Sequence, residues 1–320
     1  MKSIYLFFIV LAMVFCQPSK AVEKTDKLKV LGIQLVDEQN NPIVLRGVSF
    51  GWHNWHSRFY NSKAVETLAK DWKCSVVRAA IGVGPKNSYL QNPQQAIACA
   101  EKIIDAAIEN GIYVIVDFHS HRIYLEEAKS FFTHIAEKYR DSPNIIYEIF
   151  NEPLDTHSWE EVKSYSEELI KTIRRISTDN IILIGTPSWC QDLHLAADNP
   201  IQGWDNIMYS MHFYAGTHKE WLRNRCDEAM QKGIPIFVSE CAGMEASGGG
   251  AIDHDEWKNY MEWMEQRNIS WVCWSISDKD ETCSMLYPSA SSTGLWKDKA
   301  LKEWGKTVKN ALHKVSKERR

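Results

Sequence analysis

Short apolar segments alternate with longer amphipathic segments along almost the whole chain, and no other feature of the sequence restricts the fold as strongly. Mostly apolar strands separated by helices are typical of a parallel sheet that is covered on both faces. The expected strands are Ile43–Ser49, Ser75–Ala80, Tyr113–Phe118, Ile145–Phe150, Ile181–Gly185, Ile207–His212, Ile236–Ser239 and Ser270–Ser275. Helical periodicity between them is clearest in Tyr124–Arg140, Trp159–Ile176, Lys219–Gln231 and His254–Gln266.

About eight such units in roughly 300 residues predict an α/β fold with a single (β/α)8 barrel. A doubly wound open sheet is the alternative, but no GxGxxG motif follows the first strand. The segment Leu28–Asn41 predicts a short N-terminal β-hairpin that closes the floor of the barrel. No linker or low-complexity tract is visible, so we expect residues 22–320 to form one domain.

The first 21 residues have the pattern of a secretory signal peptide. Lys2 precedes an uncharged apolar run from Ile4 to Phe15, which at roughly 12 residues is too short to span a bilayer. Cleavage is expected between residues 16 and 21, and no later segment resembles a transmembrane helix. We therefore expect a secreted, extracellular monomer that does not enter a membrane.

Secretion also bears on the cysteines. Cys16 lies in the leader, and in an oxidising compartment some of the other cysteines are expected to form disulfides while at least one stays free. No CxxC spacing occurs, so a structural zinc site is not expected. The sequon at Asn268 adjoins a strand that we expect to be buried, so we do not expect a glycan there. The formal net charge of −4 argues against nucleic acid as a partner.

Polar and aromatic side chains stand near the carboxyl ends of nearly all the expected strands, where a barrel of this kind carries its chemistry. They are Arg78, Asp117, His119, His121, Asn151, Glu152, His212, Tyr214, Glu240 and Trp274. Glu152 and Glu240 each follow a largely apolar strand, where a solvated surface carboxylate is not expected. Two carboxylates that converge on one barrel mouth suit glycosidic bond cleavage, because one protonates the leaving oxygen while the other is ionised. The alternative is that one of them forms a structural ion pair with Arg78.

The HxH pair of His119 and His121 raises a second hypothesis, a metal site with His212 as the third ligand. This site is disfavoured because Trp274, rather than an acidic ligand, stands at the end of the last strand. His121 is then a hydrogen-bonded loop residue. No GxSxG elbow, P-loop or Rossmann motif occurs, so we expect neither a metal nor a cofactor.

The chain has 13 Trp residues, whose flat rings suit sugar recognition as well as core packing. Those on expected helices, interpreted as packing residues, are Trp159, Trp221, Trp257, Trp263 and Trp304. Those expected on the active face are Trp52, Trp55, Trp189 and Trp274, where several rings along a cleft would hold a linear sugar chain. Lys279 and Glu281 follow Trp274 and either reach sugar hydroxyls or form a solvated loop.

With these residues in order, the chain closely resembles glycoside hydrolase family 5, and within it the endo-β-1,4-glucanases (cellulases). The resemblance runs through nearly the entire mature chain. The matching segments are Val76–Ala80, Tyr113–His119, Ile145–Pro153, His212–His218, Phe237–Glu240 and Trp274–Glu281. The tripeptide Asn151-Glu152-Pro153 alone has little specificity, whereas the ordered set is specific.

The resemblance implies a retaining mechanism on a β-1,4-linked polysaccharide, with Glu152 as the acid/base and Glu240 as the nucleophile. It also implies that Asn151 binds the 2-hydroxyl of the sugar under attack. Arg78 and Tyr214 would hold Glu240 ionised and oriented.

Five further residues receive substrate-binding roles from the same resemblance. His119 and His212 would line the subsite of the cleaved bond, and Trp274 would be the platform under its sugar. Trp189 would be a platform in the neighbouring part of the cleft, and Lys279 would contact substrate.

The chain departs from the family pattern at two places. Gly51 stands where many bacterial relatives have a His, and Ile81-Gly82 stands where they have an aromatic residue. Both changes fall on the glycone side of the cleft, where they affect affinity and chain-length preference. Alternative functions are the same chemistry on xylan or mannan, and a carbohydrate-binding protein that has lost catalysis. The latter would most simply need Glu152 or Glu240 replaced, and both are present.

Overall fold

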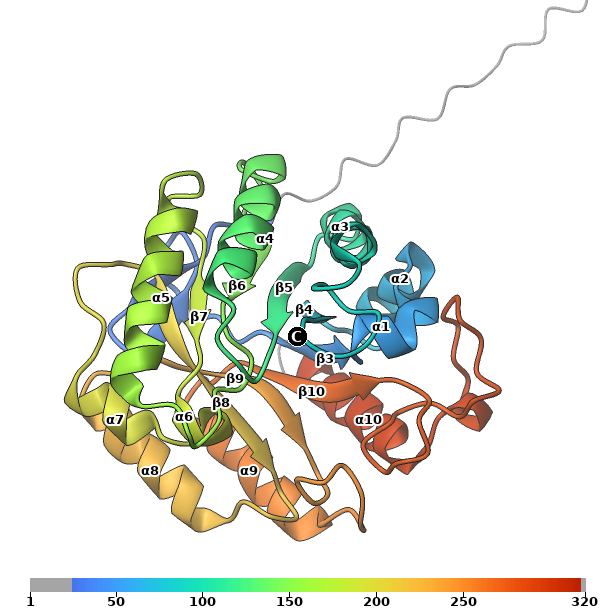
Figure 1. Ribbon diagram of the computed structural model, residues 1–320. Helices are drawn as coiled ribbons and strands as arrows, with labels where there is room; N and C mark the ends of the chain where they lie inside the picture. Colours follow the sequence, from blue (N-terminus) through green and yellow to red (C-terminus); the bar gives the residue numbers. More distant parts are fainter. Residues whose placement is uncertain (1–24, 318–320) are drawn as a thin grey trace, which may run out of the picture.

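The computed structural model describes residues 25–317, in which eight parallel strands close into a barrel with helices around it (Figure 1). The barrel strands are β3 (Arg46–Phe50), β4 (Val76–Gly82), β5 (Tyr113–His119), β6 (Ile145–Glu148), β7 (Ile182–Ile184), β8 (Ile207–Tyr214), β9 (Ile236–Ala242) and β10 (Trp271–Ile276). Each strand pairs with its neighbours in chain order, and β10 closes the ring against β3. The predicted (β/α)8 barrel is confirmed. The predicted signal peptide lies outside the described residues.

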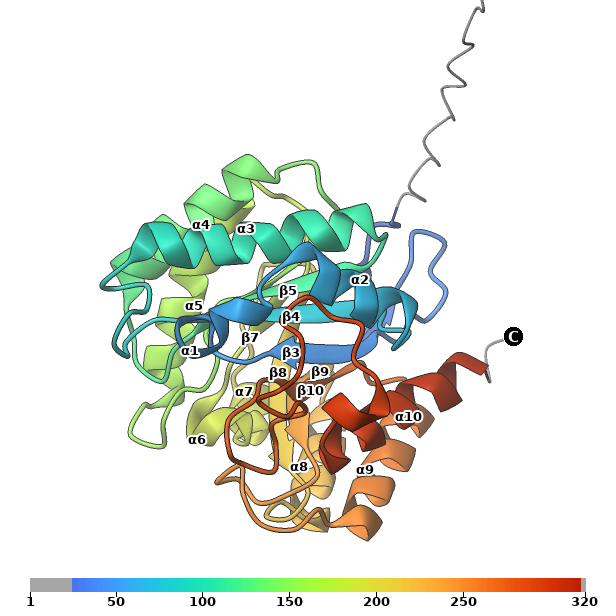
Figure 2. The ribbon, with the colours of Figure 1, turned by 90° about the vertical axis from the view of Figure 1, so that its right-hand side faces the viewer.

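The helices are α1 (His53–His56), α2 (Ser62–Lys70), α3 (Pro93–Glu109), α4 (Leu125–Lys138), α5 (Trp159–Arg174), α6 (Pro187–Cys190), α7 (Leu193–Asp198), α8 (Glu220–Gln231), α9 (His254–Gln266) and α10 (Glu303–Lys317), with 3-10 turns at Ser57–Phe59 and Asp298–Ala300. Four of the helices, α4, α5, α8 and α9, fall where amphipathic periodicity predicts them. In Figure 2, α3 and α4 lie on one side of the strands and α8, α9 and α10 on the other. The start of α5 shows how the sequence sets these bounds: Ser158 and Glu161 form a reciprocal capping box. No helix within the described range is long and apolar enough to cross a bilayer.

The predicted N-terminal hairpin consists of β1 (Lys29–Leu31) and β2 (Gln34–Val36), which pair antiparallel. Leu28 and Leu35 belong to a buried apolar cluster that also contains Val76, Ile146 and Phe237 from three barrel strands. This cluster is separate from the larger core between the barrel and its helices. The hairpin therefore closes one end of the barrel, as expected, and leaves the other end for the site.

The prediction of disulfides was wrong for the described residues, whose cysteines are all free and buried. The Sγ atoms of Cys241 and Cys273, on adjacent strands β9 and β10, are 3.8 Å apart, far beyond the ~2.05 Å of a disulfide bond. Burial raises the pKa of the Cys273 thiol well above its ordinary value. These cysteines pack as small apolar side chains within the core.

Candidate active site

The structure brings Glu152 and Glu240 together at the open end of the barrel. Glu152 lies just beyond β6, and Glu240 lies in β9. A carboxylate oxygen of each, together with a ring nitrogen of His212, lie within 4.8 Å of one another. The side chains of Glu152 and Glu240 are 14% and 6% exposed, so both are largely shielded and still reach the cleft.

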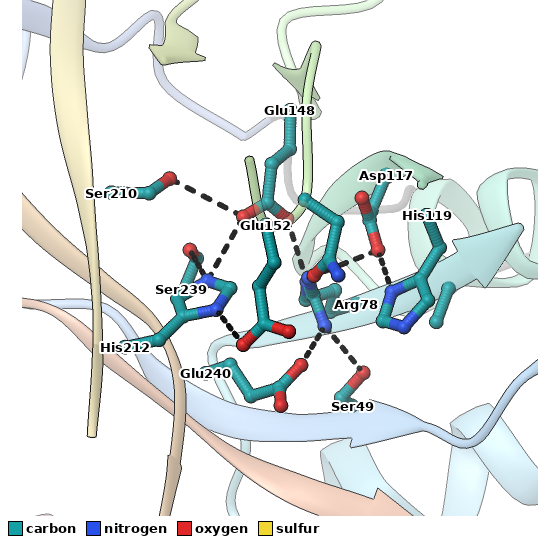
Figure 3. A network of polar contacts seen from close by, with 12 residues as sticks. Ser49, Arg78, Asp117, His119, Glu148, Glu152, Ser210, His212, Ser239 and Glu240 are labelled. Atoms are coloured by element: carbon teal, nitrogen blue, oxygen red, sulfur yellow. Dashed lines mark hydrogen bonds and ion pairs between the residues drawn. The ribbon is translucent and has the colours of Figure 1, made fainter. Parts of the chain in front are cut away.

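Arg78 is the centre of a buried polar network beneath these two carboxylates (Figure 3). Its Nε donates to Glu148 at 2.6 Å, its Nη1 to Glu240 at 2.9 Å and its Nη2 to Asn151 Oδ1 at 2.6 Å. Asp117 lies 2.9 Å from Nη2. Burial disfavours the charge of Arg78, but the three carboxylates outweigh burial and raise its pKa. The sequence analysis offered a structural ion pair with Arg78 as the alternative to a catalytic role. Glu240 does form that ion pair, and it does so within the site, beside Glu152.

Glu240 is held at both oxygens. Oε2 accepts from Arg78, and Oε1 accepts from the hydroxyl of Tyr214 at 2.8 Å. Burial and then the charge of Glu152 raise the pKa of Glu240, while Arg78 and Tyr214 oppose this rise. The ionisation of Glu240 therefore depends on whether Glu152 carries a proton.

Glu152 is held by two histidines. His212 Nδ1 lies 3.0 Å from Oε1, and His121 Nε2 lies 3.0 Å from Oε2. Burial opposes ionisation of Glu152, but these two hydrogen bonds outweigh burial and lower its pKa to about 2. His212 shows the complementary effect: burial opposes its charge, but hydrogen bonds with Glu148 and Glu152 raise its pKa to about 10. Each of the two groups thus stabilises the charged form of the other.

His119 and Trp274 form one wall of the site. Their rings stack at 5.3 Å with an interplanar angle of 10°, and His119 Nδ1 lies 2.6 Å from Asp117. Burial, followed by the charge of Arg78, lowers the pKa of His119, so its ring is neutral at pH 7. On the neighbouring strand end, the buried Nδ2 of Asn151 has no hydrogen-bond partner among the described residues. The N–H groups of this amide can therefore donate a hydrogen bond to another molecule.

A cavity of about 570 Å³ extends from the two carboxylates along α6, where Trp189 is 38% exposed. Ser188, Trp189 and Cys190 all have positive φ, between 55° and 61°, which non-glycine residues adopt only under strain. The Trp189 amide donates to the carbonyl of Pro153 at 2.9 Å, and Cys190 Sγ donates to that of Asn151 at 3.0 Å. These bonds hold the strained turn and keep the Trp189 ring at the cleft.

A smaller hollow of about 160 Å³, which shares Tyr214 with the larger cavity, is lined by Trp55, Trp274 and Lys279 among others. Lys279 is 65% exposed and pairs with Glu281 at 2.5 Å. This salt bridge presents both side chains at the rim of the hollow. Of the residues predicted for the site, Trp189, His212, Tyr214, Trp274 and Lys279 line the two hollows, whereas Arg78 and Asn151 are fully buried.

The two glycine positions that depart from the family pattern are filled by neighbouring rings. A Cβ on Gly82 would lie 2.7 Å from the Trp52 ring, and a Cβ on Gly51 would lie 2.8 Å from the His56 ring. Trp52 also packs edge-on against His119, with ring centroids 4.2 Å apart. Aromatic side chains from α1 and the residue before it thus occupy the space that a larger residue at either position would need.

The metal site suggested by the HxH pair is not formed. Among the described residues, the metal-ligand atoms that converge belong to Glu152, His212 and Glu240, without His119 or His121. His119 is bonded to Asp117, and His121 is bonded to Glu152. The convergent atoms bond to one another or to Arg78 and Tyr214, as acid–base partners do.

Sequence reasoning missed the role of three site residues. Glu148 and Asp117 are fully buried and bind Arg78, and His121 binds Glu152. An acidic residue inside an otherwise apolar, doubly covered strand is a usable signal, because a buried charge needs a partner. For His121 the signal was the HxH spacing, which the sequence analysis considered only as a possible metal site.

Comparison with known proteins finds relatives of this chain in one enzyme family. The sequence model of the family described as cellulase (glycosyl hydrolase family 5) matches residues 36–280. An endoglucanase of Clostridium saccharobutylicum is 40% identical over 89% of this chain and 65% of its own length, and endoglucanase Z of Dickeya dadantii is 40% identical over 93% and 68%. A solved structure from Cytophaga hutchinsonii is 44% identical with a TM-score of 0.90, over 92% of this chain and 96% of its own. The Thermobifida fusca endoglucanase Cel5A catalytic domain, solved in complex with cellotetraose, is 33% identical with a TM-score of 0.84, over 90% and 97%. The chain spans about two thirds of the length of the two curated relatives.

Proposed function

Because this chain belongs to the cellulases of glycosyl hydrolase family 5, we propose that it is a secreted, retaining endo-β-1,4-glucanase. Its substrates are cellulose and related β-glucans, which it cuts at internal β-1,4-glucosidic bonds. The observation that carries the proposal is the separation of Glu152 and Glu240, whose nearest oxygens lie within 4.8 Å. Retaining glycosidases have carboxyl groups about 5–5.5 Å apart, whereas inverting enzymes need about 6.5–9.5 Å to admit a water molecule.

In the first step, a carboxylate oxygen of Glu240 attacks the anomeric carbon and the bond to the leaving oxygen breaks. Glu152 gives that oxygen a proton, and a glycosyl-enzyme ester remains on Glu240. In the second step, Glu152 takes a proton from water, and the resulting hydroxide equivalent displaces Glu240. Asn151 would bind a hydroxyl of the sugar under attack, and the lack of a hydrogen-bond partner for its Nδ2 among the described residues supports this role.

Glu152 must carry a proton when it acts as the acid, although its two histidine hydrogen bonds favour the ionised form. His212 Nδ1 lies 3.0 Å from Oε1 and holds that carboxyl group in place. Neutral Glu152 no longer repels charge on Glu240, so the pKa of Glu240 falls and the nucleophile stays ionised. Protonation of Glu152 therefore favours the ionised form of Glu240 that the first step needs.

Substrate class rests on the cleft and on the relatives. Exposed Trp189 lines the larger cavity, and exposed Trp55 lines the smaller hollow with Trp274, and several such rings suit a linear chain of pyranose rings. The curated relatives are named endoglucanases, and one structural relative was solved with cellotetraose. Product analysis on carboxymethylcellulose, xylan and mannan tests this choice. Faster release of reducing ends from xylan or mannan would replace glucan as the substrate.

Two variants test the mechanism. Glu240→Gln is expected to abolish turnover of every substrate. Glu152→Gln is expected to lower activity on polysaccharide by about 10²–10⁴-fold while sparing kcat/KM on dinitrophenyl β-cellobioside, whose leaving group needs no proton in the first step. Near-native rates for Glu240→Gln would refute the nucleophile assignment. Sugar binding by the wild-type protein without release of reducing ends would instead indicate a binding protein, and loss of activity with a chelator would indicate metal-dependent hydrolysis.

Secretion rests on the leader in the sequence. Mass spectrometry of protein recovered from the culture medium is expected to find a mature chain that begins within or just after residues 16–21. Retention of the full-length chain inside the cells would contradict secretion.

A further inference from the structure

His121 lies in the loop between β5 and α4, and the mechanism above does not use it. Its Nε2 is 3.0 Å from Glu152 Oε2, while His212 binds Oε1 of the same carboxylate. An ionised carboxylate only accepts hydrogen bonds, so Nε2 of His121 is the donor. The two histidines therefore hold opposite oxygens of Glu152.

The loop is built so that His121 keeps this position. The backbone amide of Glu152 donates to the carbonyl of Ser120 at 3.1 Å, which ties the residue before His121 to Glu152 itself. Ser120 Oγ also accepts from the amide of Arg122 at 3.0 Å, which closes a local turn around His121. On the far side, the Trp52 ring stacks on the His121 ring, with centroids 5.8 Å apart and an interplanar angle of 27°.

We propose that His121 is a positioning residue for Glu152, which fixes the orientation of the carboxyl group and tunes the pH range over which it acts as an acid. The inference rests on the proposed role of Glu152 as the acid/base. A single hydrogen bond from His212 leaves the carboxyl group free to tilt about its Cγ–Cδ bond. A second donor on the other oxygen removes that freedom, and proton transfer in the transition state depends strongly on this geometry.

Removal of His121 changes the pKa of Glu152, which also depends on the other titratable groups nearby. The other titratable groups that act on this pair from the neighbouring elements are His119 on β5, Cys190 on α6, His212 and Tyr214 on β8, His218 after β8, and Glu240 on β9. The hydrogen bond from His121 lowers the pKa of Glu152. Its loss raises that pKa, so the acid form persists to higher pH.

The test compares His121→Leu with His121→Gln, whose amide can still donate to Glu152. For His121→Leu we expect kcat on cellopentaose to fall about tenfold with little change in KM, a fraction of what general acid catalysis supplies. The alkaline limb of its kcat/KM profile moves up by about one pH unit, because a donor to the carboxylate is lost. His121→Gln restores most of the rate and returns the limb toward that of wild type. On dinitrophenyl β-cellobioside, His121→Leu keeps wild-type kcat/KM within about twofold, because that leaving group needs no acid.

His134→Leu is the matched control, because His134 forms a similar 2.9 Å pair with Glu101 on the helices, away from the cleft. It is expected to leave both profiles unchanged. Equal losses on both substrates, an unmoved alkaline limb, or failure of His121→Gln to restore the rate would each overturn the positioning role. The side chain of His121 is 36% exposed, and unfolding midpoints compared across the variants separate a folding defect from a catalytic one. If Glu152→Gln fails to spare the aryl substrate, the proposed function fails. If it spares that substrate and His121→Leu shows no shift, only the role of His121 fails.

Discussion

Replacing Arg78 with Met tests whether the buried network is held together by one cation. Arg78 contacts Asp117, Glu148 and Glu240 at 2.6–2.9 Å and is fully buried. Met has a similar apolar stem and no charge, so the change leaves buried carboxyl groups without their cation. Breaking a buried ion pair from one side costs about 3–5 kcal/mol in unfolding free energy. We expect a loss of that size near pH 7.

The loss depends on pH in a direction set by the carboxyl groups. Arg78 lowers the pKa of all three carboxyl groups in the folded state, so without it the pKa of Glu148 rises from about 2, and those of Asp117 and Glu240, which burial already raises, rise further. Groups with a raised folded pKa are tolerated at low pH and destabilise the fold as pH rises. Each carboxyl that must keep a proton adds about 1.4 kcal/mol of destabilisation per pH unit above its unfolded pKa. Between pH 5 and 8, one such group makes the variant worse by up to about 4 kcal/mol relative to wild type.

Urea unfolding of wild type and Arg78→Met at pH 5, 6.5 and 8 measures this difference. Arg46→Met is the control, because Arg46 pairs with the partly exposed Glu265 away from the catalytic carboxylates. The control is expected to lose less stability, with a weak dependence on pH. A loss for Arg78→Met that is the same at pH 5 and pH 8 would refute the reasoning, as would a loss no larger than that of Arg46→Met.

Three further changes test other parts of the structure. Tyr214→Phe removes the hydrogen-bond donor to Glu240 Oε1, so kcat/KM on cellopentaose should fall about ten- to a hundredfold. The acid limb of the plot of kcat/KM against pH should move to higher pH, because Tyr214 lowers the pKa of Glu240. An unmoved acid limb would show that Tyr214 does not support the ionised nucleophile. His53 accepts from the Gly82 amide, and burial lowers its pKa to about 4, so it contributes stability above its unfolded pKa of about 6.5 that is lost as pH falls through 4. In His53→Gln, the decline of unfolding free energy between pH 7 and 4 should shrink by up to about 3 kcal/mol, and an equally steep decline would contradict the assignment. Dithiothreitol should leave the unfolding midpoint unchanged because the described cysteines are free, and a fall in the midpoint would reveal a disulfide.

The sequence was sufficient for the barrel, because each buried parallel strand is a nearly continuous apolar run. The strand ends were less well predicted. β8 extends to Tyr214 and β9 to Ala242, beyond the apolar runs that end near His212 and Ser239. Polar side chains continue these strands because they bond to one another inside the barrel mouth instead of to water, as His212 and Ser239 do at 2.9 Å.

The two carboxylates were predicted from their place after apolar strands, and the structure places them together. Glu148 and Asp117 were not singled out as partners of Arg78, because both faces of a barrel strand are buried and its sequence does not show which side chains point inward. The expectation of disulfides rested on the compartment alone. Pairing depends on which thiols meet in space, and no spacing along the chain contains that information.

The two ends of the barrel differ in the polarity of their buried side chains. The hairpin end is sealed by hydrocarbon side chains such as Leu28, Leu35 and Ile146, whereas the opposite end carries the charged network around Arg78. Directed evolution of this scaffold can therefore proceed in two separate libraries. Substitutions at the hairpin end are expected to change thermal stability with little effect on turnover, and substitutions in the loops of the open end are expected to change polymer preference.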